Sequence, residues 1–285
     1  MTSVVKIEQD EIIYFKAFLS SRSDVTLLDK KSDYESFRVK INNYTIVGYD
    51  TGNIVINSDE LKPIINEILY EIRKHKLNFD IAIGSDETGK GEWLGPLTIA
   101  AVALNPSQIL YLQGEGVKDS KELNYNNIET LSKTIKNNSI NYHVISIYPI
   151  EFNYLFNQVK KEGKNLNDIL AEGHYTAINT IMNKIKNTNT RIRITIDEFD
   201  RVKTNQKMIQ LSNQSNIEIV QKPRAEEEVV VAAASILAKR ERDKILDELS
   251  VKYEIDVRSL SQESLMLKTF ADEIIKLDYV KNQIK

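Results

Sequence analysis

The chain has 285 residues, of which 41% are hydrophobic and 28% are charged, a composition typical of one large or two modest globular domains. It contains no cysteine and only three, widely spaced histidines, which excludes a disulfide framework, a thiolate zinc site and a cysteine nucleophile. The net charge of −3 offers no overall attraction to nucleic acid. There is no apolar run long enough to cross a membrane, and acids near the N-terminus do not fit a secretory leader, so we expect a cytoplasmic protein.

Residues 1–76 predict a small α+β domain. Alternation of apolar and polar residues indicates three strands, at 36–41, 44–49 and 54–56. Asn42-Asn43 is a hairpin turn signal between the first two of these strands. Apolar residues at helical spacing predict two helices, at 11–19 and 59–76. Ser58 is the expected N-cap of the second helix, and residues 76–79 are the best candidate for a linker.

Residues 80–285 predict a second domain, in which strands alternate with helices. Strands are expected at 81–86, 96–104, 142–148, 191–197 and 217–220. Longer helices are expected at 166–186 and 228–249. One or two closing helices are expected in 250–285, with an apolar face of Leu265, Leu267, Phe270, Ile274 and Leu277. Helices that follow strands in this way indicate an α/β sheet of mixed direction.

Residues 84–91, GSDETGKG, allow three interpretations. A P-loop fits the spacing, but Gly91 replaces the hydroxyl residue that would bind magnesium, and Asp86 and Glu87 would repel nucleotide phosphates. We therefore reject a P-loop. A tight glycine turn that carries surface acids and a metal-dependent site remain. Adjacent acids at the mouth of a buried apolar strand are costly unless a cation compensates their charge, which favours the metal site.

Further acids occur where they can reach the same place. Asp197 ends an alternating strand and can lie beside Asp86, although a strand-terminal aspartate that starts a turn explains the pattern equally well. Glu226, Glu227 and Glu228 precede a helix of small apolar residues, VVVAAAS. Acids suit the first turn of any helix through its dipole. The small residues, however, imply tight packing against a sheet, which would hold the start of this helix near the strand ends.

Four segments, in this order and spacing, resemble those of the type 2 and type 3 ribonucleases H. They are GSDETGKGEWLGPL (84–97), KDSKEL (118–123), IDEF (196–199) and a K-x-R-A-E stretch that leads into VAAASILAK (231–239). The resemblance covers about residues 81–243. Residues 34–56 also resemble the strand region of the TATA-binding-protein-like domain that type 3 enzymes carry, so the type 3 enzymes are the closer match.

The resemblance implies both a fold and an activity. The fold is α/β: an RNase H-like mixed sheet with flanking helices over 80–285, preceded by a small α+β TATA-binding-protein-like, substrate-binding domain over 1–76. The activity is that of an endoribonuclease which hydrolyses the RNA strand of RNA/DNA hybrids by two-metal-ion catalysis and leaves 3′-hydroxyl and 5′-phosphate ends. The alternative is a non-catalytic hybrid-binding protein that retains the fold, and metal-dependent cleavage would separate the two.

The resemblance also implies the site residues. Two Mg²⁺ or Mn²⁺ ions would be held by four carboxylates, those of Asp86, Glu87, Asp197 and Glu226. Glu227 and Glu228 are alternatives for the fourth position. An oxygen-only ligand set suits these cations better than zinc. Carboxylates lower the net charge while bound cations face the phosphates, so a net charge of −3 is compatible with a nucleic-acid substrate.

Recognition is implied at other residues. The resemblance assigns contact with the 2′-hydroxyl to Gly89, Lys90 and Gly91, and contact with phosphate to Ser120 and Lys121. Lys90 departs from the family, in which type 2 enzymes usually have arginine there and type 3 enzymes often have threonine. Lys222 and Arg224 either touch phosphate or balance the neighbouring acids, and for His174 a surface or hydrogen-bonded role is favoured over a place near the site.

The remaining expectations concern partners and the end of the chain. The RNA/DNA hybrid is the expected partner, with no membrane and no obligate protein partner, and the protein is expected to be a monomer. Residues 250–285 contain no glycine and lack the basic-aromatic motif that type 3 enzymes carry near their end. Substrate contacts that the family makes from this region are therefore not transferred.

Overall fold

The computed structural model describes residues 2–73, 78–185, 190–212 and 216–281. The chain divides into two compact units. One consists of Met1–Asn78 together with Pro106–Glu115, and the other of Phe79–Asn105 together with Gly116–Lys285. The ten residues from Pro106 thus cluster with the front unit, although they follow the first two strands of the second unit along the chain.

The first unit is built on an antiparallel sheet of five strands in the order β1-β5-β4-β3-β2. Its strands are β1 (Ser3–Lys6), β2 (Val25–Leu27), β3 (Glu35–Ile41), β4 (Tyr44–Tyr49) and β5 (Asn53–Ile56). Its helices are α1 (Glu11–Ser21), α2 (Lys62–Arg73) and α3 (Pro106–Gly114). The three predicted strands are confirmed, and Asn42 adopts a φ of 51° in the turn between β3 and β4.

Helices and sheet of this unit share one apolar core. Its large, fully buried side chains include those of Phe15, Leu19, Ile46, Ile54 and Ile65. The predicted helix over 59–76 begins as a 3₁₀ turn, Asp59–Leu61, and Ser58 caps this turn by accepting a hydrogen bond from the Glu60 amide (3.3 Å). Residues 74–76 of that prediction lie outside the described residues.

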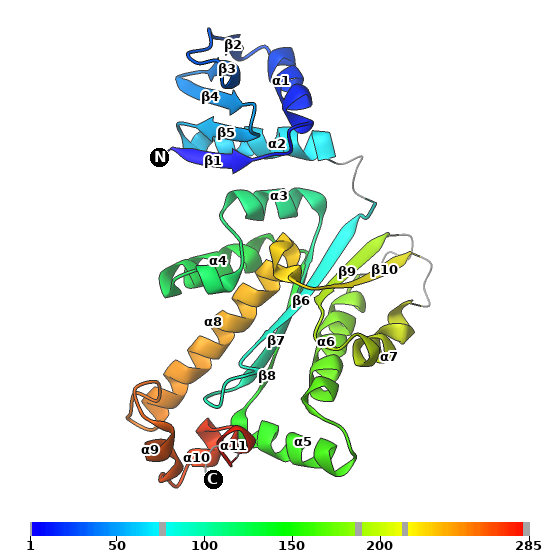
Figure 1. Ribbon diagram of the computed structural model, residues 1–285, viewed down its shortest axis with the longest axis vertical. Coiled ribbons are helices and arrows are strands. Elements are labelled where there is room, and N and C mark those ends of the chain that lie inside the picture. Colours follow the sequence, from blue (N-terminus) through cyan, green and yellow to red (C-terminus); the bar gives the residue numbers. More distant parts are fainter. Residues whose placement is uncertain (1, 74–77, 186–189, 213–215, 282–285) are drawn as a thin grey trace. The chain divides into compact units, whose positions relative to one another are not determined.

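The second unit contains a mixed five-stranded sheet in the order β10-β9-β6-β7-β8 (Figure 1). Its strands are β6 (Ile81–Thr88), β7 (Leu97–Leu104), β8 (Asn141–Ile147), β9 (Ile192–Asp197) and β10 (Ile217–Lys222). β6, β9 and β10 are parallel, whereas β7 is antiparallel to both β6 and β8. The predicted mixed sheet is confirmed: a loop joins the antiparallel strands β6 and β7, and helix α7 (Arg201–Ser212) connects the parallel strands β9 and β10.

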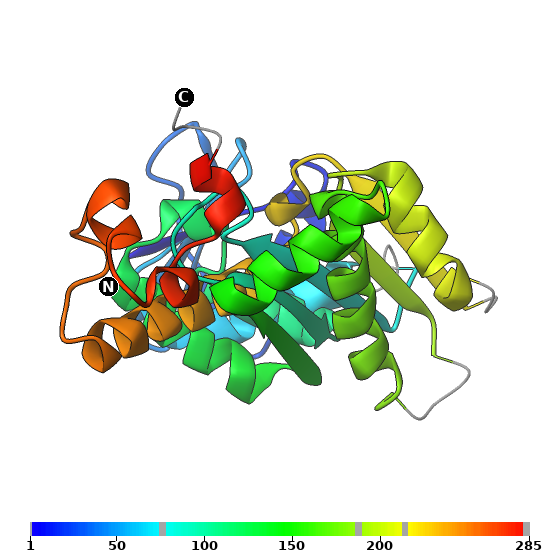
Figure 2. The ribbon, with the colours of Figure 1, turned by 90° about the horizontal axis from the view of Figure 1, so that it is seen from below.

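Helices cover both faces of this sheet (Figure 2). α6 (Leu166–Met182) and α7 (Arg201–Ser212) pack on one face and α8 (Val229–Lys252) on the other, while α4 (Tyr125–Asn138) packs on α8 and α5 (Pro149–Lys161) on α6. Along β6, alternate residues point to opposite faces, so Ile83 joins the core under α6 while Gly84 faces α8. A Cβ atom at Gly84 would lie 2.4 Å from the backbone carbon of Val230. The small residues of VVVAAAS therefore bring α8 close to β6, as their compactness predicts.

The C-terminal stretch ends in three short helices, where one or two were expected. They are α9 (Gln262–Met266), α10 (Ala271–Ile274) and α11 (Leu277–Lys281). Leu265 and Ile274 are buried against α8, but Leu267 is 86% exposed, so its prediction as an apolar-face residue is wrong. The physical reason is that Leu267 follows a helix of only five residues, where the chain turns and the helical spacing is lost. Within the described ranges, none of the helices is long and apolar enough to span a membrane.

Candidate active site

Two of the candidate acids lie side by side at the ends of neighbouring parallel strands. β6 and β9 are paired up to Ser85 and Ile196, and Asp86 and Asp197 are the next residue in each strand. The carboxylate of Asp197 is oriented by the next segment, since its Oδ1 accepts a hydrogen bond from the Ala225 amide (3.2 Å). The sheet thus brings together acids that are far apart in the sequence.

Asp86 and Glu87 are adjacent in one strand and therefore point to opposite faces of the sheet. Asp86 faces α8, where it accepts a hydrogen bond from the Ser235 hydroxyl. Glu87 faces α6, where its Oε2 lies 3.1 Å from Nε2 of His174. The pair thus spans the end of β6, with one carboxylate anchored to each flanking helix.

His174 is a buried link between Glu87 and the core of the sheet. Its Nδ1 lies 2.7 Å from the Ser85 hydroxyl oxygen, and that hydroxyl is 2.8 Å from the carbonyl oxygen of Ala100. Since the single Ser85 proton is directed to Ala100, the serine oxygen accepts from Nδ1. The ring also stacks on Phe199 with centroids 5.3 Å apart, so His174 holds a fixed orientation toward Glu87. His174 does form hydrogen bonds, but it is buried and lies beside the acids, so the expectation that placed it away from the site is wrong.

The two adjacent acids have opposite pKa shifts. Asp86 as a whole residue is partly exposed, but its carboxyl group is surrounded by protein. This burial, together with the negative charge of Glu87, raises the pKa of Asp86 to about 7. Burial also acts to raise the pKa of Glu87, but the hydrogen bond with His174 and the nearby charges of His174 and Lys90 outweigh it and lower that pKa. Lys90 Nζ lies 3.5 Å from Glu87 Oε1. Without a cation, Asp86 is therefore the acid that holds a proton near neutral pH.

The structure distinguishes the three consecutive glutamates. Glu228 is neutralised on the sheet, where it accepts from the Thr195 hydroxyl (2.9 Å) and pairs with Lys222 Nζ (2.7 Å). The side chain of Glu227 is 70% exposed, whereas that of Glu226 is 22% exposed. The interpretation of Lys222 as a balance for neighbouring acids is thus supported by a direct contact.

Glu226 shares a charged neighbour, Lys121, with Asp86. Its Oε1 is 3.6 Å from Lys121 Nζ. Burial lowers the pKa of Lys121, but the charges of Asp119, Glu226 and Asp86 together raise it. One lysine therefore interacts with both candidate ligands, Asp86 and Glu226.

Ser120 and Lys121, the predicted phosphate-contacting pair, differ in exposure. Ser120 is buried, and its hydroxyl lies 2.8 Å from that of Ser235, which in turn reaches Asp86. Lys121 keeps an exposed ammonium group. Ser235 itself was not predicted as a site residue, although it is the single polar residue in the segment VVVAAAS.

The donor set suits a hard divalent cation, because all four candidate ligands offer carboxylate oxygens. Among the described residues, however, no three acid or histidine side chains are grouped closely enough to hold one ion. Asp86 and Glu87 point to opposite faces of the sheet, which keeps their carboxylates apart. A buried carboxyl group with a raised pKa is nevertheless a position where a cation would replace a proton.

The raised pKa of Asp86 predicts an unusual stability profile for the metal-free protein. Since its pKa rises from 3.8 to about 7 on folding, the folded state binds more protons, and stability falls as the pH increases through this window. In EDTA at pH 8, Asp86→Asn should be more stable than wild type by on the order of 2 kcal/mol, because asparagine stays neutral. Urea unfolding at pH 5 and 8 measures this. A wild-type advantage at pH 8 would contradict it.

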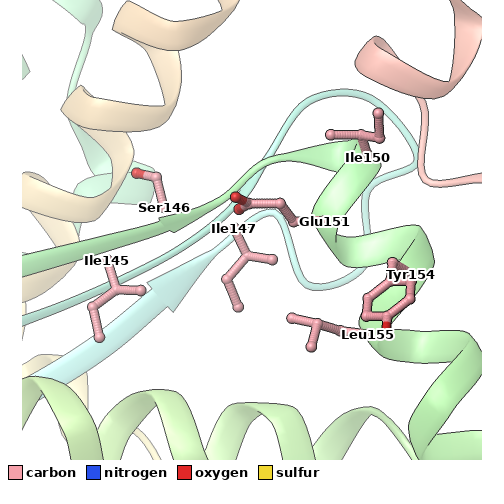
Figure 3. Close-up of a pocket in the computed structure, with 7 residues that line it drawn as sticks. All are labelled: Ile145, Ser146, Ile147, Ile150, Glu151, Tyr154 and Leu155. Carbon is pink, nitrogen blue, oxygen red and sulfur yellow. The ribbon is translucent and has the colours of Figure 1, made fainter.

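A separate apolar hollow lies between β8 and the start of α5 (Figure 3). Its volume is about 540 Å³. It is lined by Ile145, Ser146, Ile147, Ile150, Glu151, Tyr154 and Leu155. None of the candidate site residues contributes to it, so it is not the place where the acids meet.

Comparison with known proteins identifies the family. Residues 83–262 match the family description ribonuclease HII, and all four motif segments fall in this range. The chain is 32% identical to the ribonuclease HIII of Protochlamydia amoebophila over 78% of this chain and 73% of that protein. It is 33% identical to the ribonuclease HIII of Chlamydia pneumoniae over 78% and 74%, respectively. The chain belongs to the ribonuclease HII/HIII family.

Solved structures of ribonucleases HIII have the same fold. Bst-RNase HIII in complex with Mn²⁺ aligns over 99% of this chain and 97% of its own, with a TM-score of 0.57 and 20% identity. Aquifex aeolicus RNase H3 aligns over 97% of this chain and its full length, with a TM-score of 0.56 and 21% identity. The predicted α/β fold, an RNase H-like sheet preceded by a small α+β unit, is confirmed.

Proposed function

We propose that this ribonuclease H hydrolyses the RNA strand of RNA/DNA hybrids as an endonuclease and leaves 3′-hydroxyl and 5′-phosphate ends. One observation carries this proposal: Asp86 and Glu87, near the C-terminal end of β6, lie beside Asp197, the last residue of the parallel strand β9, in a chain of the ribonuclease HII/HIII family. We place the protein in the cytoplasm, in keeping with its lack of cysteine, as a monomer.

Asp86, Glu87, Asp197 and Glu226 are the proposed ligands of two Mg²⁺ or Mn²⁺ ions. The Mn²⁺ complex of Bst-RNase HIII supports a divalent cation. Ions held there would supply the activation of a water nucleophile and the stabilisation of the leaving 3′-oxygen. The chain's own groups orient the ligands: Ser235 holds Asp86, His174 holds Glu87, and the Ala225 amide holds Asp197.

Recognition is assigned to groups around the acids. The loop of Gly89, Lys90 and Gly91 directly follows β6 and is the proposed reader of the 2′-hydroxyl, which only an RNA strand supplies. Lys121, exposed and close to Glu226, is the proposed phosphate contact, with Ser120 fixing the backbone beside it. The front unit, with its TATA-binding-protein-like sheet, is the proposed additional surface for the hybrid.

The fourth ligand is tested by a matched pair of substitutions. Glu226→Gln should reduce cleavage of a labelled hybrid in Mn²⁺ by at least about 100-fold, because a neutral amide no longer compensates the charge of an ion. Glu227→Gln changes the same group one residue away and should remain within about twofold of wild type, since its side chain is exposed. A reversed order of these two activities would transfer the role to Glu227.

A further inference from the structure

The C-terminal segment 274–279 runs beside the loop that joins β6 to β7. Leu94 and Ile275 form an isolated antiparallel bridge. On either side of it, the Gly95 amide donates to the Ile274 carbonyl (2.8 Å) and the Lys276 amide donates to the Trp93 carbonyl (2.8 Å). The last part of the chain therefore extends the backbone structure of the loop that carries Gly89–Gly91.

Lys276 adds a buried side-chain contact to this backbone pairing. It is fully buried, and its Nζ donates to the carbonyl oxygen of Gly95 (2.6 Å) above the ring of Phe152 (5.8 Å). Burial lowers the pKa of Lys276 to about 7. Within the part of the chain that the structure describes, this ammonium group forms no ion pair, so its burial is costly. The hydrogen bond from Nζ to the Gly95 carbonyl, in the loop between β6 and β7, offsets part of this cost.

Tyr279 contacts the segment Gly89–Gly91, which we call the recognition loop. Its hydroxyl donates to the carbonyl oxygen of Lys90, and its ring packs on Phe152 with centroids 6.0 Å apart. A peptide unit is planar, with its C=O and N–H pointing in opposite directions. Holding the Lys90 carbonyl therefore also fixes the direction of the Gly91 N–H.

The Gly91 amide is free to bind a ligand. It has no acceptor among the residues that the structure describes. A Cβ atom at Gly91 would have nothing within 4 Å, so the position is open. An amide that is fixed in direction, unpaired and accessible suits a hydroxyl oxygen as its acceptor.

The C-terminal segment is itself anchored from α5. The buried Asn153 donates through Nδ2 to the Ile275 carbonyl (2.9 Å) and accepts through Oδ1 from the Leu277 amide (2.8 Å). These bonds flank Lys276. The chain of contacts thus leads from α5 through the C-terminal segment to the recognition loop.

We infer that Lys276 and Tyr279 are positioning residues for substrate recognition, which hold the loop so that the Gly91 amide faces the 2′-hydroxyl of the RNA strand. This inference rests on the proposed function, in which that loop reads the RNA. It assigns a role to the C-terminal stretch, whose sequence departs from the family pattern.

Tyr279→Phe is the sharper test, because it removes one hydroxyl and keeps the ring on Phe152. We expect KM for the hybrid to rise roughly fivefold, the effect of one lost hydrogen bond, with kcat within about twofold. Tyr253→Phe is the matched control: it also removes a hydroxyl of the C-terminal region, one that contacts Glu273 (2.5 Å) and not the loop. An unchanged KM in Tyr279→Phe would overturn the role of Tyr279.

Lys276→Met tests the second contact, with the exposed Lys268→Met as its control. The readout is the dissociation constant of the hybrid relative to a DNA duplex of the same sequence, measured in the inactive Asp86→Asn background. We expect Lys276→Met and Tyr279→Phe each to weaken hybrid binding roughly fivefold and duplex binding little. Equal weakening of both ligands by Tyr279→Phe, or none, would overturn the inference even if Lys276→Met fails to fold.

The proposed function and this inference fail in different ways. If wild type neither binds nor cleaves the hybrid, the proposed function is wrong. If wild type cleaves the hybrid, and Lys276→Met and Tyr279→Phe both match it in KM and in their preference for hybrid over DNA duplex, only the positioning role is wrong.

Discussion

Asp86→Asn is expected to reduce hybrid cleavage by on the order of 1,000-fold in either Mg²⁺ or Mn²⁺, while hybrid binding stays within about twofold. The substitution keeps the shape of the side chain and its hydrogen bond with Ser235, but it removes the charge that a cation needs. Single-turnover cleavage of a labelled hybrid, with binding measured in parallel in EDTA, separates the two effects.

The control for this experiment is Asp80→Asn, at the residue just before the same strand. Asp80 is an exposed acid that pairs with Arg191 (2.9 Å), so its loss should leave the cleavage rate within about twofold of wild type. Equal cleavage by Asp86→Asn and wild type would sink the proposed site. A wild-type protein that binds the hybrid but fails to cleave it in both Mg²⁺ and Mn²⁺ would instead support the non-catalytic alternative.

Gly84→Ala is expected to lower the free energy of unfolding by about 3 kcal/mol, since overpacking a tight contact forces backbone to move. The added Cβ would lie 2.4 Å from the Val230 backbone carbon, and backbone in a helix cannot rotate away as a side chain can. Because α8 also carries Ser235, the same shift should reduce cleavage. Urea denaturation monitored by circular dichroism measures the loss of stability.

Gly91→Ala is the matched control, because the same methyl group would meet no atom within 4 Å there. Its free energy of unfolding should stay within about 0.5 kcal/mol of wild type. Comparable losses in both variants would show that the close approach of α8 to β6 is not what makes Gly84 sensitive.

Strands of the two sheets could be predicted where apolar and polar residues alternate over six or more positions. The segments 36–41, 44–49 and 191–197 agree with β3, β4 and β9 within one residue at either end. The shorter strands β1 and β2, with four and three residues, carry too little alternation to be detected. The prediction that Leu267 lies on an apolar helix face was wrong for a related reason, because helical spacing predicts a shared face only within one continuous helix.

The amino-acid sequence by itself determined the chemistry of the candidate site. With no cysteine and few histidines, carboxylates are the remaining metal ligands, and GSDETGKG placed two of them at a strand end. Tertiary structure decided which groups act together. It separated Glu226 from Glu228, which Lys222 and Thr195 neutralise, and it brought the C-terminal segment to the recognition loop. Local patterns record which face of a strand or helix a residue occupies, whereas contacts between distant segments depend on how those faces pack, which no short window of sequence contains.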